Sequence, residues 1–396
     1  MKPFLQAEQA VLGAILLDPG QLPSLTWLDP AHFYRPAHRA LFAAMRKLHA
    51  DGQLTVTAEE EVAVEWVTGA VAEASRYVRG LSAGYAHTLI AACPRSGHAA
   101  VYGRMVLEGA IHRTVTEHAV RLHQAARADA LQGRVDGALH HADVLADVLT
   151  DLARRWGTEP RPLAPAGSPE TMTQPASAAT EQALQDEQFL LSVLVNQPPA
   201  MGNVIGWLRP TDFAGHGHGQ LYRCLGALHH RGEPIDHLTV LWEAQRRGHL
   251  AEGTLTDEQL RNICNGFGAG SAEYLGEQTL RSSLTRTAAA SASAIRALAQ
   301  DEALAPGRLI NHALHALGPL DEVRARWRTA TGEPAAPQPA TGGPPTAARI
   351  DAALARSQPR LPARPDAAMQ SPRAQPPTRT PTAVSPDHPH PQRSHP

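Results

Sequence analysis

Several closely spaced histidines could serve as metal ligands. They occur as His216-x-His218, His229-His230 and His140-His141-x-Asp143. A metal site needs three or four ligands that converge on one point with a fixed outer shell. Adjacent residues of a helix do not face the same way, so we expect no metal site in any of these groups and no cofactor.

Acid–base and nucleophilic chemistry find no better support. Glu8 and Glu187 occupy equivalent places in a repeated segment, but neither has a second carboxylate at a suitable spacing. A glutamate in the first turn of a helix is in any case favoured by the helix dipole. Cys93 has no partner in a nucleophile motif, and G-x-S-x-G does not occur. The phosphate-binding loop GxxxxGK[ST] needs a Gly-Lys pair, which the sequence lacks. We therefore expect no catalytic residue, and neither helicase nor ATPase activity, in this chain.

Charge and cysteine usage exclude further classes of protein. The formal net charge is only −2, so neither half has the basic excess of a dedicated nucleic-acid binder. Cys93, Cys224 and Cys264 lack CxxC spacing, which argues against a disulfide framework. No apolar run approaches the roughly 18 residues of a membrane span, and the apolar N-terminal stretch lacks a signal-peptide cleavage site. We expect a cytoplasmic protein that does not contact a membrane.

The segment from Glu8 to Gly52 recurs, with a one-residue insertion, from Glu187 to Gly232. Repetition at about the length of a domain indicates duplication of a whole module, whereas solenoids repeat at about 20 to 50 residues. We expect a structural role for the recurring positions, because the repeated histidine lies beside a phenylalanine at the start of an amphipathic helix. These positions are Glu8, Gln9, Gly13, Phe33, His38 and Phe42 in the first copy, and Glu187, Gln188, Phe213, His218 and Tyr222 in the second.

Each copy begins with short helices and ends with two long ones. In the first copy Asp29-Pro30 predicts a capped short helix, and the apolar spacing after Pro36 predicts a helix that ends at Gly52. Two long helical stretches, 99–128 and 135–156, meet at a short turn and predict an αα-hairpin.

The returning helix of each hairpin carries an apolar seam with alternating spacings of four and three residues. The expected interface residues on these seams are Leu139, Ala142, Ala146, Leu149 and Trp156 in the first copy, and Ala313, Ala316, Leu320, Val323 and Trp327 in the second. In the second copy the outgoing helix, about 272–298, is rich in Ala and Ser at 288–294, so it could pack closely against a neighbour.

Composition sets the remaining boundaries. The all-α chain is expected to contain a first domain at 1–157, a flexible linker at 158–182 rich in Pro, Ala, Ser and Thr, a more diverged second domain at 183–331, and a tail at 332–396. The tail holds 16 of the 33 prolines and almost no apolar residues, so it should be disordered. Its seven arginines against four acids would allow a weak contact with nucleic acid, although a solvated tail is the preferred interpretation.

The order of these features resembles the N-terminal domain of bacterial replicative DNA helicases of the DnaB type. The first copy carries EQAVLGAILL from Glu8, L-x-P-x-x-F-Tyr34, His38, Ala92-Cys93-Pro94 and Tyr102-x-x-Met105-Val106 leading to Arg113. The second copy is similar and adds Gly232-Glu-Pro-Ile-Asp236-His-Leu-Thr239-Val-Leu, which the first copy lacks. The resemblance covers about residues 5–157 and 184–330.

In that family a helical head is joined to a helical hairpin, hairpins of two subunits pair into a dimer, and three dimers form a collar that docks the primase. The ATPase motor is a separate domain. Arg104 and Arg113 match positive positions of the family and are the candidate partner-contact residues, with a solvated helix face as the alternative interpretation.

The leading hypothesis is a non-catalytic interaction protein of DNA replication, whose hairpins self-associate within the chain and which contacts primase or a replicative helicase in a primosome. A DNA-binding replication or partition factor that uses the arginine-bearing tail is the alternative. A decayed helicase paralogue without a present partner is the second alternative.

Overall fold

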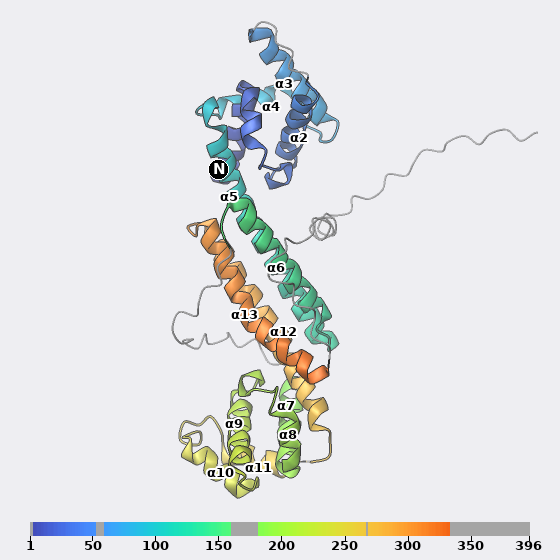
Figure 1. Ribbon diagram of the computed structural model, residues 1–396, viewed down its shortest axis with the longest axis vertical. Helices are drawn as coiled ribbons and strands as arrows, with labels where there is room; N and C mark the ends of the chain where they lie inside the picture. Colours follow the sequence, from blue (N-terminus) through green and yellow to red (C-terminus); the bar gives the residue numbers. More distant parts are fainter. Residues whose placement is uncertain (1–2, 53–58, 160–180, 267, 333–396) are drawn as a thin grey trace, which may run out of the picture. The chain divides into compact units, whose positions relative to one another are not determined.

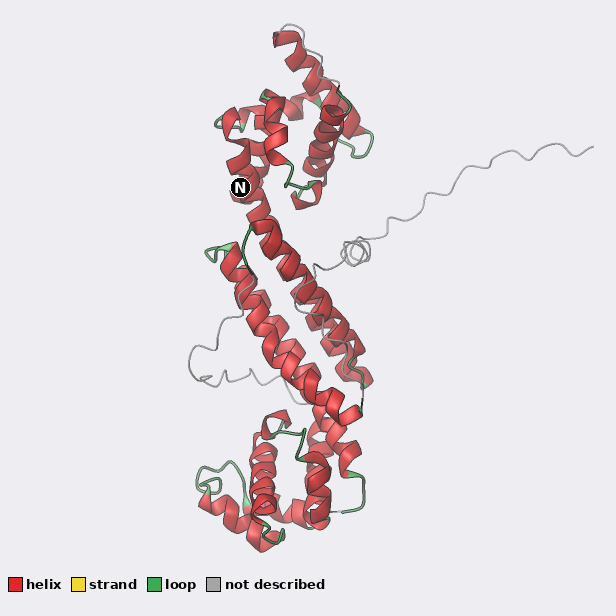
Figure 2. Ribbon diagram, in the orientation of Figure 1, coloured by secondary structure: helices red, strands yellow, loops and turns green. Residues whose placement is uncertain are grey.

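A computed structural model describes residues 3–52, 59–159, 181–266 and 268–332. The described residues are built from helices joined by loops and turns, and no strand occurs among them (Figure 2). The predicted all-α class, with a head and a long αα-hairpin in each copy, is therefore confirmed. The expected tail except for Gly332, and the linker except for its first two and last two residues, lie outside the described residues.

The first copy contains a head and one hairpin (Figure 1). The head consists of α1 (Pro3–Leu17), η1 (Pro19–Leu25), η2 (Pro30–His32), α2 (Pro36–Ala50), α3 (Glu59–Ser75), α4 (Ala83–Ala91) and η3 (Ser96–His98), and the hairpin of α5 (Ala99–Gln132) and α6 (Asp136–Trp156). The predicted cap at Asp29 is present, because its side chain accepts from the Ala31 amide. Gly133 turns the chain between α5 and α6 with φ +63°, a conformation that glycine adopts without steric cost.

The second copy repeats this order. Its head consists of α7 (Glu181–Asn196), η4 (Pro198–Ala200), α8 (Met201–Val204), η5 (Pro210–Asp212), α9 (His216–Arg231), α10 (His237–Arg246) and α11 (Asp257–Cys264), and its hairpin of α12 (Ala272–Gln300) and α13 (Pro306–Thr331). In both copies the first helix of the head packs against the outgoing helix of the hairpin, α1 against α5 and α7 against α12.

A tryptophan of each head packs on a glycine of the outgoing helix. A Cβ on Gly276 would lie 2.6 Å from Cη2 of Trp207, and a Cβ on Gly103 would lie 3.3 Å from Cη2 of Trp27. Any larger residue at Gly276 would push the head away from the hairpin, because real Cβ atoms do not approach so closely. These two glycines therefore let each head pack directly on its hairpin.

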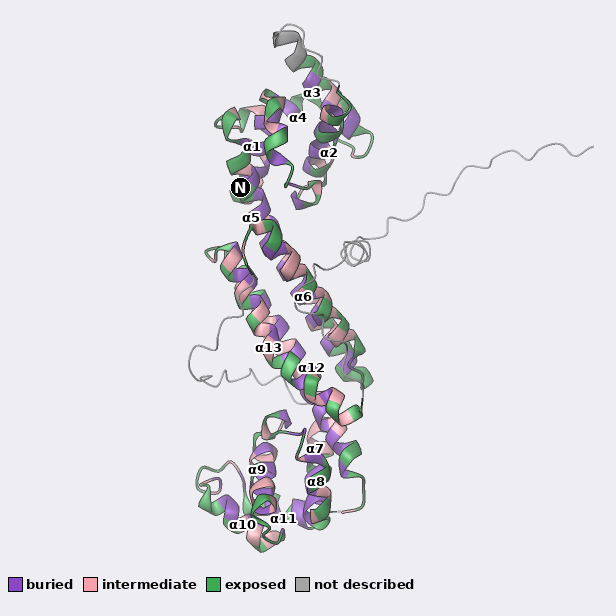
Figure 3. Ribbon diagram, viewed as in Figure 1, coloured by how far each residue is buried: buried purple, intermediate pink, exposed green. Residues whose placement is uncertain are grey.

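The four hairpin helices α5, α6, α12 and α13 pack against one another, and buried residues occur along all of them (Figure 3). α5 contacts α12 along much of its length, and α6 contacts α13. Apolar burial is the main favourable term in such packing, at about 25 cal/mol per Å² of apolar surface removed from water. No helix in the described ranges is long and apolar enough to cross a membrane.

Candidate protein-interaction interface

The recurring glutamate and histidine of the first copy form a buried clamp at the start of α2. Glu8 is 1% exposed and accepts from the backbone amides of Tyr34 and Arg35 and from Nδ1 of His38, the last at 2.7 Å. Nε2 of His38 lies 2.7 Å from the Tyr85 hydroxyl. A carboxylate at a helix N-terminus satisfies amides that have no partner within the helix and is favoured by the helix dipole. The clamp therefore joins α1, α2 and α4.

The second copy has the same clamp at the start of α9. Glu187 accepts from the amides of Ala214 and Gly215 and from Nδ1 of His218, the last at 2.9 Å. The ring of His218 is 21% exposed, whereas that of His38 is fully buried under Tyr85. These contacts assign the recurring glutamate and histidine to the structure of each head.

Most of the other recurring positions pack within the same head as the clamp. The rings of Phe33 and Phe42 pack at a centroid distance of 4.9 Å, and the equivalent rings of Phe213 and Tyr222 pack at 5.0 Å. A Cβ on Gly13 would lie 2.2 Å from the Leu89 carbonyl oxygen, so α1 and α4 touch there. Gln9 is half-buried, and Gln188 is exposed.

An arginine of each outgoing hairpin helix binds the short helix of its own head. Arg113 donates to the His32 carbonyl, and Arg286 donates to the carbonyl of Asp212, the equivalent residue. The Arg113 guanidinium also lies 5.6 Å from the ring centroids of Phe4 and Tyr34. Arg113, a candidate partner-contact residue, is thus engaged within its own copy and does not form part of an open charged face.

The two copies differ at this junction in their ion pairs. In the second copy the buried Asp212 carboxylate accepts from both terminal nitrogens of Arg326 and from Ser283. In the first copy His32 occupies the place of Asp212, and burial lowers its pKa to about 4, so the ring is neutral at pH 7. Arg155, the equivalent of Arg326, instead pairs with Asp151 on its own helix at 2.7 Å.

Each returning helix carries, in or near its last turn, a tryptophan that packs against an arginine of the outgoing helix. The Arg104 guanidinium lies 4.4 Å from the Trp156 ring centroid, and the Arg281 guanidinium lies 5.6 Å from that of Trp327. Such contacts contribute about 0.5–1 kcal/mol at exposed sites. Arg104 remains exposed on the hairpin surface while it covers Trp156.

The hairpins of the two copies meet through their outgoing helices, α5 and α12, which run antiparallel. The ring nitrogens of His112 lie 3.0 Å from the Ala299 carbonyl oxygen and 3.1 Å from that of Leu304, at the end of α12 and in the turn after it. Further along α5, Nδ1 of His123 lies 3.4 Å from the hydroxyl of Ser293. A position late on α5 thus faces an earlier position on α12.

Small residues let the two outgoing helices approach each other. Ala288 and Ala292 of α12 are fully buried, as are Val115 and Ala119 of α5. This contact matches the expectation that the Ala- and Ser-rich part of the second outgoing helix packs closely against a neighbour. Contact between α5 and α12 is more extensive than that between the two returning helices.

The returning helices α6 and α13 are joined by Arg324. Its two terminal nitrogens donate to Asp143 at 2.7 Å and to the Leu139 carbonyl at 3.0 Å. Only 12% of the Arg324 side chain is exposed. Asp143, which the sequence groups with two histidines as a potential ligand set, is therefore engaged in an ion pair between the copies.

The predicted seam residues lie on the packed side of the returning helices, at two levels of burial. Buried are Ala142, Leu149, Ala313, Leu320, Val323 and Trp327, and half-buried are Leu139, Ala146, Trp156 and Ala316. The most buried stripe of α6 also includes Ala138, Leu145 and Leu152. Together with Ala142 and Leu149 they follow a spacing of four and three residues, so a wider apolar stripe could have identified them.

Sequence reasoning missed His112, His123 and Arg324, which make polar contacts between the copies. Each is a single polar residue on a helix with polar neighbours, and no local pattern distinguishes it. A comparison of the two copies offers one signal. Arg113 and Arg286 occupy equivalent positions, so His112 corresponds to Thr285 and marks a place where the copies have diverged.

The described residues thus form two helical modules, each a head joined to a long αα-hairpin, and the two hairpins pack against each other. The family model described as DnaB-like helicase N terminal domain matches residues 2–108 and 179–275, which is more than half of the chain. The chain therefore belongs to the family of DnaB-like helicase N-terminal domains and contains two of them.

Curated relatives agree with this assignment. The chain is 35% identical over 125 residues to the replicative DNA helicase DnaB of Geobacillus stearothermophilus, covering 30% of this chain and 25% of the relative. It is 36% identical over 126 residues to that of Mycobacterium leprae, covering 30% and 19%. The match to that of Treponema pallidum is 31% identical over 132 residues and covers 33% and 28%. The chain thus spans about a quarter of the length of these helicases, and no solved structure matches it.

Proposed function

We propose that this chain is a non-catalytic interaction protein of DNA replication, in which two helicase-collar modules pair through their hairpins within one polypeptide. The observation that carries the proposal is the contact between α5 and α12, together with the ion pair between Arg324 and Asp143. In this arrangement the chain presents the equivalent of a collar dimer without the need for a second subunit.

The proposed partners are a primase or a replicative helicase of the same cell. The relatives named above are replicative helicases, and the match to them is confined to the N-terminal domain. A pair of collar modules offers the surface of a helicase collar. Such a chain would recruit a primase, or cap and modulate a helicase, through protein contacts.

The experiment uses the full chain with a protease site inserted between residues 160 and 180. After cleavage, size-exclusion chromatography with light scattering reports whether the two halves stay together. Co-elution at the mass of the whole chain supports pairing through the hairpins. Separation of the halves at micromolar concentration refutes the internal pair on which the proposal rests.

A second measurement addresses the partners. The intact chain is mixed with purified primase and with purified replicative helicase from the same organism, and complex formation is followed by light scattering. Formation of a complex with either protein supports the proposal. Tight DNA binding in a gel shift that survives removal of residues 332–396, without binding to either protein, would favour a DNA-binding factor instead.

A further inference from the structure

The second head exposes two large apolar side chains on one face of α10. Leu238 is 70% exposed and Trp242 is 61% exposed. They are four residues apart, so they lie next to each other on the helix surface. The opposite face of α10 packs into the head through Val240 and Ala244, which are fully buried. The exposed pair therefore contributes nothing to the core of this head.

The first copy shows that the fold does not require apolar residues on that face. Its helix α3 takes the place of α10, and a buried glutamate, Glu73 in α3 and Glu243 in α10, ties each helix to its neighbours. With these glutamates superimposed, the positions of Leu238 and Trp242 correspond to Thr68 and Ala72. The duplicated module thus folds with a polar and a small residue where the second copy exposes Leu and Trp.

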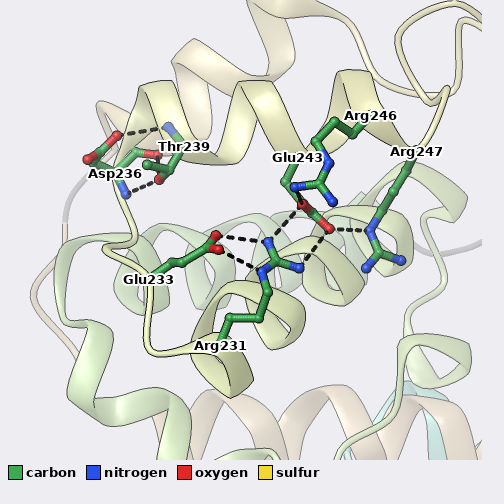
Figure 4. A network of polar contacts seen from close by, with 7 residues as sticks. All are labelled: Arg231, Glu233, Asp236, Thr239, Glu243, Arg246 and Arg247. Atoms are coloured by element: carbon green, nitrogen blue, oxygen red, sulfur yellow. Dashed lines mark hydrogen bonds and ion pairs between the residues drawn. The ribbon is translucent and has the colours of Figure 1, made fainter.

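The same face also carries a weakly engaged arginine, Arg246 (Figure 4). Glu243 accepts from Arg247 at 2.6 Å and from Arg231 at 2.8 Å, which leaves Arg246 at 3.8 Å. Burial raises the pKa of Glu243, but hydrogen bonds from Arg231 and Arg247 outweigh it, so the pKa lies below its ordinary value and the carboxylate stays charged.

The equivalent arginine of the first copy is closely paired. Arg76 lies 2.7 Å from Glu73. In the second copy Arg231 and Arg247 lie closer to the carboxylate than Arg246 does, and the side chains of both equivalent arginines are largely exposed, 58% for Arg246 and 71% for Arg76. Arg246 follows Trp242 by four residues, so Leu238, Trp242 and Arg246 form a single row on the exposed side of α10.

We propose that this row, the α10 face, is a docking surface for a helical segment of another protein that presents apolar side chains beside a carboxylate. Tryptophan and arginine are, with tyrosine, the residue types most enriched among energetically dominant interface residues. An amphipathic helix can place apolar side chains on Leu238 and Trp242 through its i and i+4 positions, and a carboxylate flanking them would pair with Arg246. The inference rests on the proposed function, because it names the chemistry of the partner.

The test uses the full chain and two fluorescently labelled synthetic helical peptides. One carries leucines four residues apart, flanked by glutamates, and the other has lysines in place of the glutamates. Binding is measured by fluorescence anisotropy against the wild type, the double variant L238T/W242A and R246Q. The double variant introduces the residues that the first copy carries at these positions, so the fold is expected to tolerate it, and circular dichroism checks this.

We expect the glutamate peptide to bind the wild type at least tenfold more tightly than L238T/W242A and several-fold more tightly than R246Q. The lysine peptide should bind the wild type at least tenfold more weakly than the glutamate peptide. The proposal is overturned if the glutamate peptide does not bind, or if it binds all three proteins equally. Equal binding of the two peptides to the wild type would also overturn it.

A second occupant gives a distinct result. If light scattering shows that the wild type dimerises and L238T/W242A does not, the α10 face is covered by another copy of the chain, and the proposed partner is wrong. Failure of the peptide test leaves the hairpin pair intact, because α10 lies in the head and makes its contacts with α9 and α11. The cleavage experiment described above therefore distinguishes failure of this proposal from failure of the proposed function.

Discussion

Replacing Arg324 by alanine should weaken the pairing of the two copies without unfolding either one. Arg324 belongs to α13, where it lies 3.7 Å from Asp321, and it makes two contacts with α6, to Asp143 and to the Leu139 carbonyl. Its side chain is 12% exposed, while that of Asp143 is 63% exposed. The two contacts therefore differ in strength.

The expected loss follows from that difference. Because Asp143 is largely solvated, water screens the ion pair, which contributes about 0.5–1 kcal/mol. The hydrogen bond from the charged donor to the partly buried Leu139 carbonyl contributes about 1.5–3 kcal/mol. Together they predict a loss of about 2–4 kcal/mol, which corresponds to roughly 30- to 700-fold weaker association of the two halves.

The assay compares the dissociation constants of the cleaved halves, measured by analytical ultracentrifugation over a dilution series. R308A is the matched control, because Arg308 is exposed on the same helix. The control should associate as the wild type does. The reasoning is refuted if R324A stays within threefold of the wild type, or if R308A weakens association as much as R324A.

Three further predictions concern the heads and the hairpins. Glu8→Gln leaves the amides at the start of α2 without a charged acceptor. We therefore expect the free energy of unfolding to fall by about 2–3 kcal/mol and hydrogen exchange in the first turn of α2 to become faster. Unchanged exchange would contradict the clamp. Asp212→Asn leaves Arg326 without its counter-charge, so we expect the free energy of unfolding, measured by calorimetry, to fall by about 3 kcal/mol or more. A fall below about 1 kcal/mol would show that the pair is effectively solvated. Burial lowers the pKa of His32 and of His118 from 6.5 to about 4, so unfolding takes up protons. Their contribution to stability is complete above pH 6.5 and is lost as the pH falls towards 4, by up to about 3 kcal/mol each. Urea unfolding across this pH range should therefore show a smaller loss of stability in His118→Gln than in the wild type.

The sequence predicts the hairpins well, because long helices must bury a regular stripe. The spacing from Leu139 to Trp156 repeats every three to four residues, and such spacing requires an apolar partner. The turn glycine, Gly133, and the cap at Asp29 are local signals that depend only on neighbouring residues. These features could therefore be identified without knowledge of any distant contact.

The polar contacts between elements could not be predicted in the same way. Arg113 matches a positive position of the family, yet its guanidinium binds a backbone carbonyl of the head. Asp143 stands beside two histidines in the sequence, yet it pairs with a residue of the other copy. In both cases the partner lies far away in the chain, and neither spacing nor composition encodes which distant group a long side chain reaches.

Duplication within one chain frees the two modules from the constraint of symmetry. In a dimer of identical subunits each residue of the interface must serve both partners. Here His112 caps the end of α12, while the residue at its position in the second copy is Thr285, which bonds to carbonyls of its own helix. The contacts between head and hairpin also differ, because the first copy has His32 where the second has Asp212.

The same freedom accounts for the α10 face. An apolar row on a module that pairs symmetrically would appear twice in every assembly and would double the exposed hydrophobic surface, which promotes unwanted association. With two unlike copies, the chain can keep Thr68 and Ala72 on one head and expose Leu238 and Trp242 on the other. The duplication therefore allows a pair of collar modules to carry a single docking surface on one side only.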